Sequence, residues 1–209
     1  MVSDPSVSRA AEILDRAAAV DPSRPDGRLR RNLLIAAALR EVLSSEPVVV
    51  GGTAEDYWSA DEYHETDLDL VAWSLTPRDR VRLRELGFTK TGRHWVHAAT
   101  GVPVEFPETT LAGDVGRIRR EELRPGVAAI IGLEDLYLDR VRQSTVDPDD
   151  EALHTYRSAL AIAASNFDAM DWPYVDAVIR GERQVQPELM RRIHRRIRMT
   201  VRDRLAGSP

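Results

Sequence analysis

The sequence predicts an α/β protein of the α+β kind, in which a small mixed β-sheet with flanking helices precedes a C-terminal helical region. Short apolar runs bounded by Gly and Pro predict the strands, and apolar residues at helical spacing surround them. From Gly132 onward the pattern is helical. Because the expected order in the first half is helix, strand, helix, strand, helix and hairpin, we expect a mixed sheet with helices on at least one face.

Two helices and a strand come first. Apolar residues recur at helical spacing over 6–20 and again over 28–43, and a Pro- and Gly-containing segment separates the two stretches. The apolar strand 48–50 then runs into Gly51-Gly52-Thr53. Thr53 is a suitable cap for a short helix over 54–59.

The next elements complete the expected sheet. A strand covers 66–73, and Thr76-Pro77 begins a helix that Gly87 ends. Two short strands, 93–97 and 102–106, are joined by a turn and predict a hairpin. Residues 107–126 are expected to be irregular or partly helical, and 126–131 can form one last strand. Four helices are expected after it, over 133–143, 148–164, 172–179 and 187–205.

Composition excludes several classes of protein. The 209 residues include 34 acidic and 29 basic side chains and no cysteine, which excludes disulfides and cysteine-ligated metal sites. No run approaches the ~20 apolar residues that span a membrane, so we expect no membrane partner and a cytoplasmic location. The predicted division is a sheet region with N-terminal helices over 1–112 and a helical region over 113–209, although both could pack as one domain.

Three acidic residues interrupt the apolar strands. Side chains alternate along a strand, so Asp67 and Asp69 are expected on one face while Leu68 and Leu70 face the other. Glu105 likewise interrupts the apolar run 102–106. Unpaired acids in such strands would be costly. Three carboxylates beside a Gly-Gly turn therefore predict a site for a divalent metal and a triphosphate, with Mg²⁺ or Mn²⁺ as the cofactor.

The Gly-Gly turn suits the phosphates of such a ligand. Gly51 and Gly52 leave backbone N–H groups exposed at a helix N-terminus, and Thr53 adds a hydroxyl donor. Neither a Walker loop nor a dinucleotide fingerprint is present. Arg93 and His94 begin the hairpin near Glu105 and could reach a nucleotide, although an exposed strand edge is the commoner explanation.

Together these motifs resemble a known family. Gly51-Gly52-Thr53, Asp67-x-Asp69 and Glu105 are similar to the minimal nucleotidyltransferase fold of the DNA polymerase beta superfamily. The chain more closely resembles nucleotidyltransferase-like toxins of abortive-infection and toxin-antitoxin systems. The segments that carry this resemblance are Val49 to Ala54, Thr66 to Leu70, Leu86-Gly87-Phe88 and Val104 to Pro107. The resemblance covers about residues 30–165. It implies that Asp67, Asp69 and Glu105 are catalytic and bind the metal.

The same resemblance assigns a role to Arg140. Family members carry a lysine that contacts the triphosphate on a later helix, and Arg140 occupies that place within Leu133 to Arg140. Arginine can still clamp a phosphate. The alternative is an ion pair with Glu134 or Asp139 on the helix surface.

The last expected helix has a basic face. An apolar stripe of Leu189, Ile193, Ile197, Val201 and Leu205 would dock on the body. Arginines surround this stripe, and those taken as candidate RNA contacts are Arg191, Arg192, Arg195 and Arg198. A solvated face or an acidic partner protein explains them equally well.

The resemblance implies transfer of a nucleoside monophosphate from an NTP to an RNA, specifically a tRNA 3′ end, by a toxin with a cognate antitoxin protein. Asp67 and Asp69 would hold the metals, and Glu105 would complete one site and activate the acceptor hydroxyl. Two alternatives stay open. One is a small-molecule nucleotidyltransferase of the aminoglycoside type, with an acidic cleft in the helical half. The other is an inactive nucleotide-binding or interaction module.

Overall fold

The computed structural model describes residues 4–59, 67–183 and 185–207. These residues divide into two compact units, the first made of 4–54 and 67–131 and the second of 55–59 and the described residues from 132 onward. The expected α+β class is confirmed, because the described residues form eight α-helices and a seven-stranded mixed sheet. None of the helices in this part of the chain is long and apolar enough to cross a membrane.

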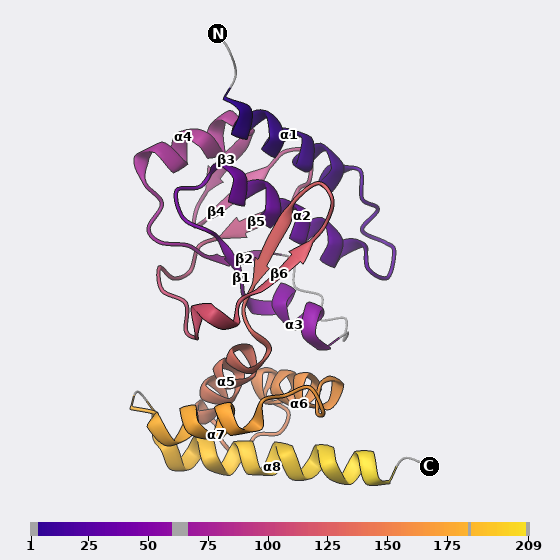
Figure 1. Ribbon diagram of the computed structural model, residues 1–209, viewed down its shortest axis with the longest axis vertical. Helices are drawn as coiled ribbons and strands as arrows, with labels where there is room; N and C mark the ends of the chain where they lie inside the picture. Colours follow the sequence, from indigo (N-terminus) through magenta and orange to yellow (C-terminus); the bar gives the residue numbers. More distant parts are fainter. Residues whose placement is uncertain (1–3, 60–66, 184, 208–209) are drawn as a thin grey trace. The chain divides into compact units, whose positions relative to one another are not determined.

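Helices α1 (Pro5–Ala18) and α2 (Gly27–Val42) pack against each other in the first unit (Figure 1). Asp4 caps α1 by accepting a hydrogen bond from the Ser6 amide at 3.0 Å. The predicted stripe of α1 is buried at Ala10, Ile13, Leu14 and Ala17. Helix α2 is buried along its middle, over 32–39, because it contacts both α1 and strand β7 (Val127–Ile130).

The centre of the sheet lies in the first unit. Strand β2 (Leu68–Val71) pairs antiparallel with β1 (Val48–Val49) and parallel with β5 (Pro103–Glu105), while β1 pairs parallel with β7. The full strand order is β3-β4-β5-β2-β1-β7-β6. The strands expected at 48–50 and 66–73 are therefore present but shorter. Thr66, where the second was expected to begin, lies outside the described residues.

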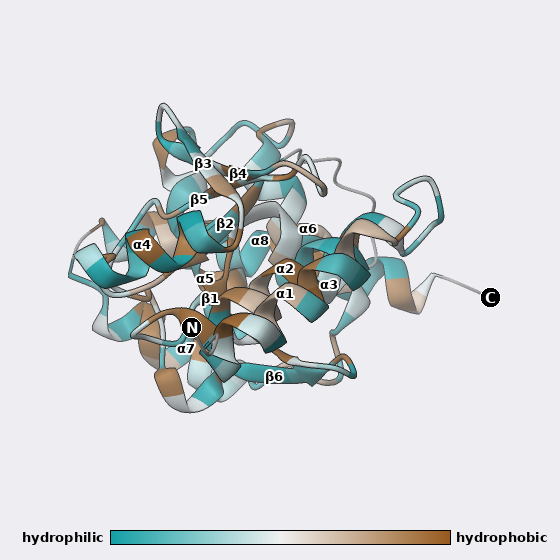
Figure 2. Cartoon of the chain, turned by 90° about the horizontal axis from the view of Figure 1, so that it is seen from above, coloured by the Kyte–Doolittle hydropathy of each residue, from teal (hydrophilic) through white to brown (hydrophobic). Residues whose placement is uncertain are grey.

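Both edges of the sheet contain strands that the sequence did not predict. The expected hairpin is confirmed as β4 (His94–His97) and β5, which pair antiparallel. Strand β3 (Phe88–Thr91) pairs antiparallel with β4 on the far side. At the other edge, β6 (Arg119–Glu122) follows a 3₁₀ turn, η1 (Val115–Arg117), in the segment expected to be irregular or partly helical. Figure 2 shows β6 as a hydrophilic strand.

Two short helices follow strands. Helix α3 (Gly51–Ser59) begins at Gly51, so Thr53 lies in its first turn and the expected cap at Thr53 is wrong. Helix α4 (Pro77–Glu85) begins as predicted: the Thr76 hydroxyl accepts a hydrogen bond from the Asp79 amide at 3.1 Å, and the Asp79 carboxylate accepts one from the Thr76 amide at 2.8 Å.

The second unit is helical, as predicted after Gly132. Its helices are α5 (Leu133–Gln143), α6 (His154–Ser165), α7 (Trp172–Gly181) and α8 (Pro187–Ala206), with a 3₁₀ turn, η2 (Ser144–Val146), after α5. Helix α6 begins later than expected. The buried residues of α8 are Met190, Ile193, His194, Ile197 and Val201, so Leu189 and Leu205 do not belong to the buried stripe.

The division between the units falls after Ile131. The predicted division at residue 112 lies before β6 and β7, which are part of the sheet. The first unit thus extends further along the chain than the prediction placed it. The structure also groups 55–59, the second half of α3, with the helical unit.

Candidate metal centre

Asp69 and Glu105 are brought together by the sheet. Their Cα atoms are partners across the parallel strands β2 and β5. Paired residues on adjacent strands point to the same face, and the strands lie about 4.8 Å apart. Leu68 and Val104, the preceding pair, are both buried on the other face. The alternation of acidic and apolar residues that the sequence predicted is therefore present.

Asp67 and Glu105 also converge, and His94 joins them. One ligand atom from each of these residues lies within 4.8 Å of the others, so the group could hold a metal ion. His94 Nε2 is 3.4 Å from Glu105 Oε2 and 3.7 Å from Asp67 Oδ2. Carboxylate oxygens suit Mg²⁺ and Mn²⁺, and imidazole suits transition metals. The donor set therefore fits a divalent cation.

His94 was not predicted as a metal ligand. The register of the hairpin places it there: Trp95 pairs with Val104, and the next antiparallel position brings His94 opposite Glu105. The sequence predicted the hairpin, but it did not predict which residues of the two strands pair. The possibility that His94 and Arg93 lie near a nucleotide was the only signal for this position.

Asp69 occupies a different place from the other two acids. Among the described residues, the group that could hold a metal contains Asp67 and Glu105 but not Asp69. The Asp69 carboxylate instead lies against Gly51, where an added Cβ would come 2.4 Å from Oδ2. Gly51 has a φ of +62°, which favours glycine. A carboxylate at the start of α3 is also stabilised by the positive end of the helix dipole.

Arg93 neutralises part of the acidic group. Its Nε lies 2.9 Å from Glu105 Oε2 and donates to His94 Nε2 at 3.2 Å. The Arg93 side chain is exposed, whereas that of Glu105 is 15% exposed. The guanidinium therefore already interacts with Oε2 of Glu105, one of the oxygens that a bound cation would use. A bound metal ion would compete with Arg93 for Glu105.

The Gly-Gly-Thr segment places its polar groups differently from the prediction. Gly52 and Thr53 are buried in the first turn of α3. The Thr53 hydroxyl accepts a hydrogen bond from Asn32 Nδ2 at 3.0 Å. Its hydrogen remains a possible donor, because a hydroxyl both donates and accepts. The roles of Gly51, Gly52 and Thr53 in phosphate binding stay predictions.

Arg140 lies in the second unit, where it is largely buried and pairs with acidic side chains. Its guanidinium pairs with Glu55 through Nε and with Asp139 through Nη1 at 2.9 Å. Its side chain is 9% exposed and that of Glu55 is 1% exposed. The pair with Asp139 is one of the alternatives raised from the sequence, while Glu134 instead accepts from the Asp171 amide at 2.9 Å. A triphosphate contact by Arg140 stays a prediction.

A basic pocket adjoins the acidic group within the first unit. Its volume is about 420 Å³, and Arg93 belongs both to its lining and to the acidic group. The charged residues in the lining are Arg80, Arg84, Lys90, Arg93 and Glu108. Four cations against one acid suit an anionic group of a substrate. No motif in the sequence predicted this pocket, whose lining residues all lie between 72 and 109.

The four arginines proposed as RNA contacts lie on α8. Arg191, Arg192 and Arg195 are exposed, and Arg198 is half-buried. The geometry thus leaves a basic surface on this helix, as predicted, while its contact with RNA stays a prediction.

Neither a protein-family model, nor a curated protein, nor a solved structure matches this chain.

Proposed function

We propose that this chain is a metal-dependent nucleotidyltransferase that moves a nucleoside monophosphate from an NTP to a hydroxyl group of an RNA. The observation that carries the proposal is the pairing of Asp69 with Glu105 across β2 and β5, beside Asp67. Three carboxylates of this kind, next to a helix N-terminus and a basic pocket, suit a triphosphate and its metal ions.

The Asp67, His94 and Glu105 group would hold the metal, with Asp69 as its neighbour. Mg²⁺ or Mn²⁺ bound there would offset the charge of the triphosphate and stabilise the attacking and leaving oxygens. The start of α3 would orient phosphate oxygens through the backbone N–H groups of its first turn. Arg93 and the basic pocket would bind an anionic part of the substrate.

In the proposed reaction, the acceptor hydroxyl oxygen bonds to the α-phosphorus, and the bond from that phosphorus to the bridging oxygen of the β-phosphate breaks. Pyrophosphate leaves with the electron pair of the broken bond. The hydroxyl proton passes to Glu105, the acid opposite His94.

The resemblance described above extends the proposal to a tRNA 3′ end as the acceptor and to a toxin neutralised by a cognate antitoxin. The basic face of α8 is compatible with an RNA partner. A cationic small molecule as acceptor would need an acidic cleft in the helical unit. The 450 Å³ pocket of that unit is lined by five arginines and a single acid, which does not suit a cation.

One observation favours a second candidate, a module that binds nucleotides without turnover. Arg140, which would replace the family lysine, is engaged by Glu55 and Asp139 within its own unit. A guanidinium held in this way would have to leave two acids to reach a phosphate. The transfer assay below separates this candidate from the enzyme.

The test is to incubate purified protein with total RNA and each of the four α-labelled NTPs, with Mg²⁺ or Mn²⁺, beside Asp69→Ala. Asp26→Ala, an exposed acid of the same unit whose side chain makes no capping hydrogen bond, is the matched control. We expect label in a tRNA-sized band with wild type and Asp26→Ala only. Absence of label with every NTP, in protein that still binds nucleotide with metal, would favour the inactive module.

A further inference from the structure

The second unit contains a pocket that the transfer reaction does not use. It lies between α7 and α8, with a volume of about 450 Å³. Its charged and titratable lining consists of Asp176, Arg180, Arg191, His194, Arg195, Arg198 and Arg202. Arg191, Arg195, Arg198 and Arg202 follow one another at spacings of four, three and four residues, so α8 presents them along one stripe.

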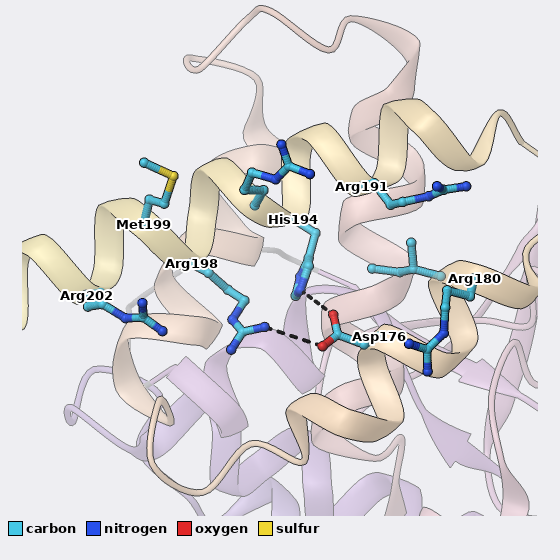
Figure 3. Close-up of a pocket in the computed structure, with 9 residues that line it drawn as sticks. Asp176, Arg180, Arg191, His194, Arg198, Met199 and Arg202 are labelled. Atoms are coloured by element: carbon cyan, nitrogen blue, oxygen red, sulfur yellow. Dashed lines mark hydrogen bonds and ion pairs between the residues drawn. The ribbon is translucent and has the colours of Figure 1, made fainter.

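The one acid in this lining is already engaged. Asp176 Oδ1 is 3.1 Å from His194 Nε2, and Asp176 Oδ2 is 3.5 Å from Arg198 Nη1. Figure 3 shows His194 and Arg198 directed at the Asp176 carboxylate, with Arg180 and Arg202 on opposite sides of it in this view. Asp176 therefore offsets the charge of Arg198, and little of its negative charge is left to offset the other arginines.

Three of the arginines have no acidic partner among the residues that the structure describes. Arg191 pairs with Glu188 at 3.2 Å. Within the described part of the chain, no ion pair is found for Arg180, Arg195 or Arg202. Arginines four residues apart on one helix face repel each other. An anion in the pocket would relieve this repulsion, and guanidinium groups bind phosphate oxygens in a bidentate manner.

The rest of the lining is apolar. Ile179 is buried, and Met199 is 58% exposed beside the arginines. A flexible thioether adapts to flat or irregular apolar groups. The combination of several arginines with such a surface suits a phosphate that carries an apolar group, as a nucleotide does.

We infer that the pocket between α7 and α8 is a binding site for nucleotide phosphate groups, either in a free nucleotide or in a strand of RNA. The site uses as its cations Arg180, Arg195 and Arg202, which form no ion pair within the described ranges. It includes three of the four arginines proposed from the sequence as RNA contacts, adds Arg180 and Arg202, and excludes Arg192. It does not depend on the transfer chemistry of the first unit.

The test measures binding by the full chain at low salt in the presence of EDTA, so that no metal-dependent site contributes. Two probes distinguish the sources: ADP by titration calorimetry, and a fluorescein-labelled single-stranded RNA 12-mer by anisotropy. We expect Arg195→Gln and Arg202→Gln each to weaken binding by about tenfold, which is the usual effect of losing one charge-assisted hydrogen bond.

The matched control is Arg192→Gln, which removes the same charge from the same helix outside the pocket, where Arg192 is 3.3 Å from Asp149. We expect it to retain nearly wild-type affinity. Binding of both ADP and RNA would identify a site that accepts free nucleotides as well as RNA strands. Binding of RNA alone would identify a site for RNA strands only. Failure of both probes to bind saturably, or an equal loss in Arg192→Gln, would overturn the inference.

The three variants should fold, because the side chains that they replace, Arg192, Arg195 and Arg202, are exposed. Circular dichroism and thermal melting check this directly. The assay contains no divalent ion, so an inactive first unit would leave its result unchanged. Failure of the proposed transfer reaction and failure of this site are therefore separate outcomes.

Discussion

Asp69 and Glu105 occupy paired positions on the parallel strands β2 and β5, and the Asp69 carboxylate also lies against Gly51. Asp69 is thus fixed by the sheet on one side and by the start of α3 on the other. The backbone of Asp69 contributes as well, since its carbonyl accepts from the Val50 amide at 3.0 Å. Gly51 is therefore the position where a small change should disturb the candidate centre most.

Gly51→Ala is expected to displace Asp69. The new Cβ would come 2.4 Å from Asp69 Oδ2, and alanine at a φ of +62° is strained by about 1–2 kcal/mol. We predict a lower melting temperature together with loss of metal-dependent nucleotide binding. Differential scanning fluorimetry and nucleotide titration with Mn²⁺ measure the two effects.

Gly92→Ala is the matched control for that variant. Gly92 has a similar φ of +58°, but an added Cβ there meets nothing within 4 Å. It should therefore show the backbone strain without the clash, and nucleotide binding should survive. Equal loss of nucleotide binding in both variants would contradict the role given to the contact between Gly51 and Asp69.

His94→Gln is predicted to weaken metal binding. His94 offers the third ligand atom of the group with Asp67 and Glu105. Loss of a residue that merely supports a ligand often costs about 10–100-fold in affinity, so loss of a ligand should cost at least about tenfold. Electron paramagnetic resonance of Mn²⁺ gives the affinity. His97→Gln, on the same strand but outside the group, should bind Mn²⁺ like wild type.

Arg93→Gln is predicted to change metal affinity in the opposite direction. The Arg93 guanidinium lies 2.9 Å from Glu105 Oε2 and competes there with any cation. Its removal should raise Mn²⁺ affinity several-fold and, because it also lines the basic pocket, weaken binding of the anionic substrate. Arg78→Gln, an exposed arginine of the same unit, should leave Mn²⁺ affinity unchanged. A drop in Mn²⁺ affinity for Arg93→Gln would show that Arg93 supports the acids instead.

The sequence could predict acids whose position follows from local alternation. Asp69 and Glu105 each interrupt an apolar strand, so the period of two was enough to place each acid opposite the apolar face of its own strand, while their pairing depends on the register of β2 and β5. His94 could not be assigned in this way, because its approach to Glu105 depends on the register between β4 and β5. The partner of Arg140 was similarly hidden, since Glu55 lies 85 residues earlier in the chain.

The same limit explains the strands that were missed. Strand β3 has one buried residue followed by three exposed ones, and β6 consists of Arg119, Arg120, Glu121 and Glu122. Both lie at the edges of the sheet. Charged edge strands discourage pairing with other chains, and they lack the apolar alternation that marks a strand in the sequence. The helices of the second unit were easier to predict because apolar spacing persists over several turns.

Asp79→Asn is predicted to destabilise the first unit by about 1–2 kcal/mol, the usual effect of losing a helix cap. The carboxylate is buried and accepts hydrogen bonds from the amides and hydroxyls of Ser44 and Thr76, at 2.7 to 2.8 Å. Urea denaturation at pH 7 measures the change in the free energy of unfolding. Asp26→Asn is the matched control, because Asp26 precedes α2 without a capping hydrogen bond from its side chain.

The contribution of Asp79 should also depend on pH. Burial alone would raise its pKa, but the hydrogen bonds from Ser44 and Thr76 outweigh burial, and the pKa of Asp79 is lowered. A lowered pKa in the folded state stabilises the protein above the unfolded pKa, about 3.9, and this stabilisation is lost as pH falls through the folded value. The difference between wild type and Asp79→Asn should therefore be constant from pH 5 to 7 and shrink below about pH 4. A difference that stays constant down to pH 2 would contradict this.

Arg140→Met is predicted to destabilise the second unit more than any surface change. It would leave Glu55, whose side chain is 1% exposed, as a buried carboxylate without its main partner. Such a loss usually costs about 3–5 kcal/mol. The double variant Glu55→Leu and Arg140→Met should recover much of this cost, because replacing a whole buried pair by apolar groups is often nearly neutral. Urea denaturation of both variants, beside the exposed Arg157→Met, measures the free energies of unfolding.

The same pair of variants tests the role that the family resemblance gives to Arg140. If the side chain is purely structural, the double variant should fold and keep metal-dependent nucleotide binding. If Arg140 contacts the triphosphate, the double variant should recover stability but lose nucleotide affinity by about tenfold or more. Because Glu55 and Asp139 already neutralise the guanidinium, we expect the first result. Weakened nucleotide binding in the stable double variant would instead support a direct contact between Arg140 and the triphosphate.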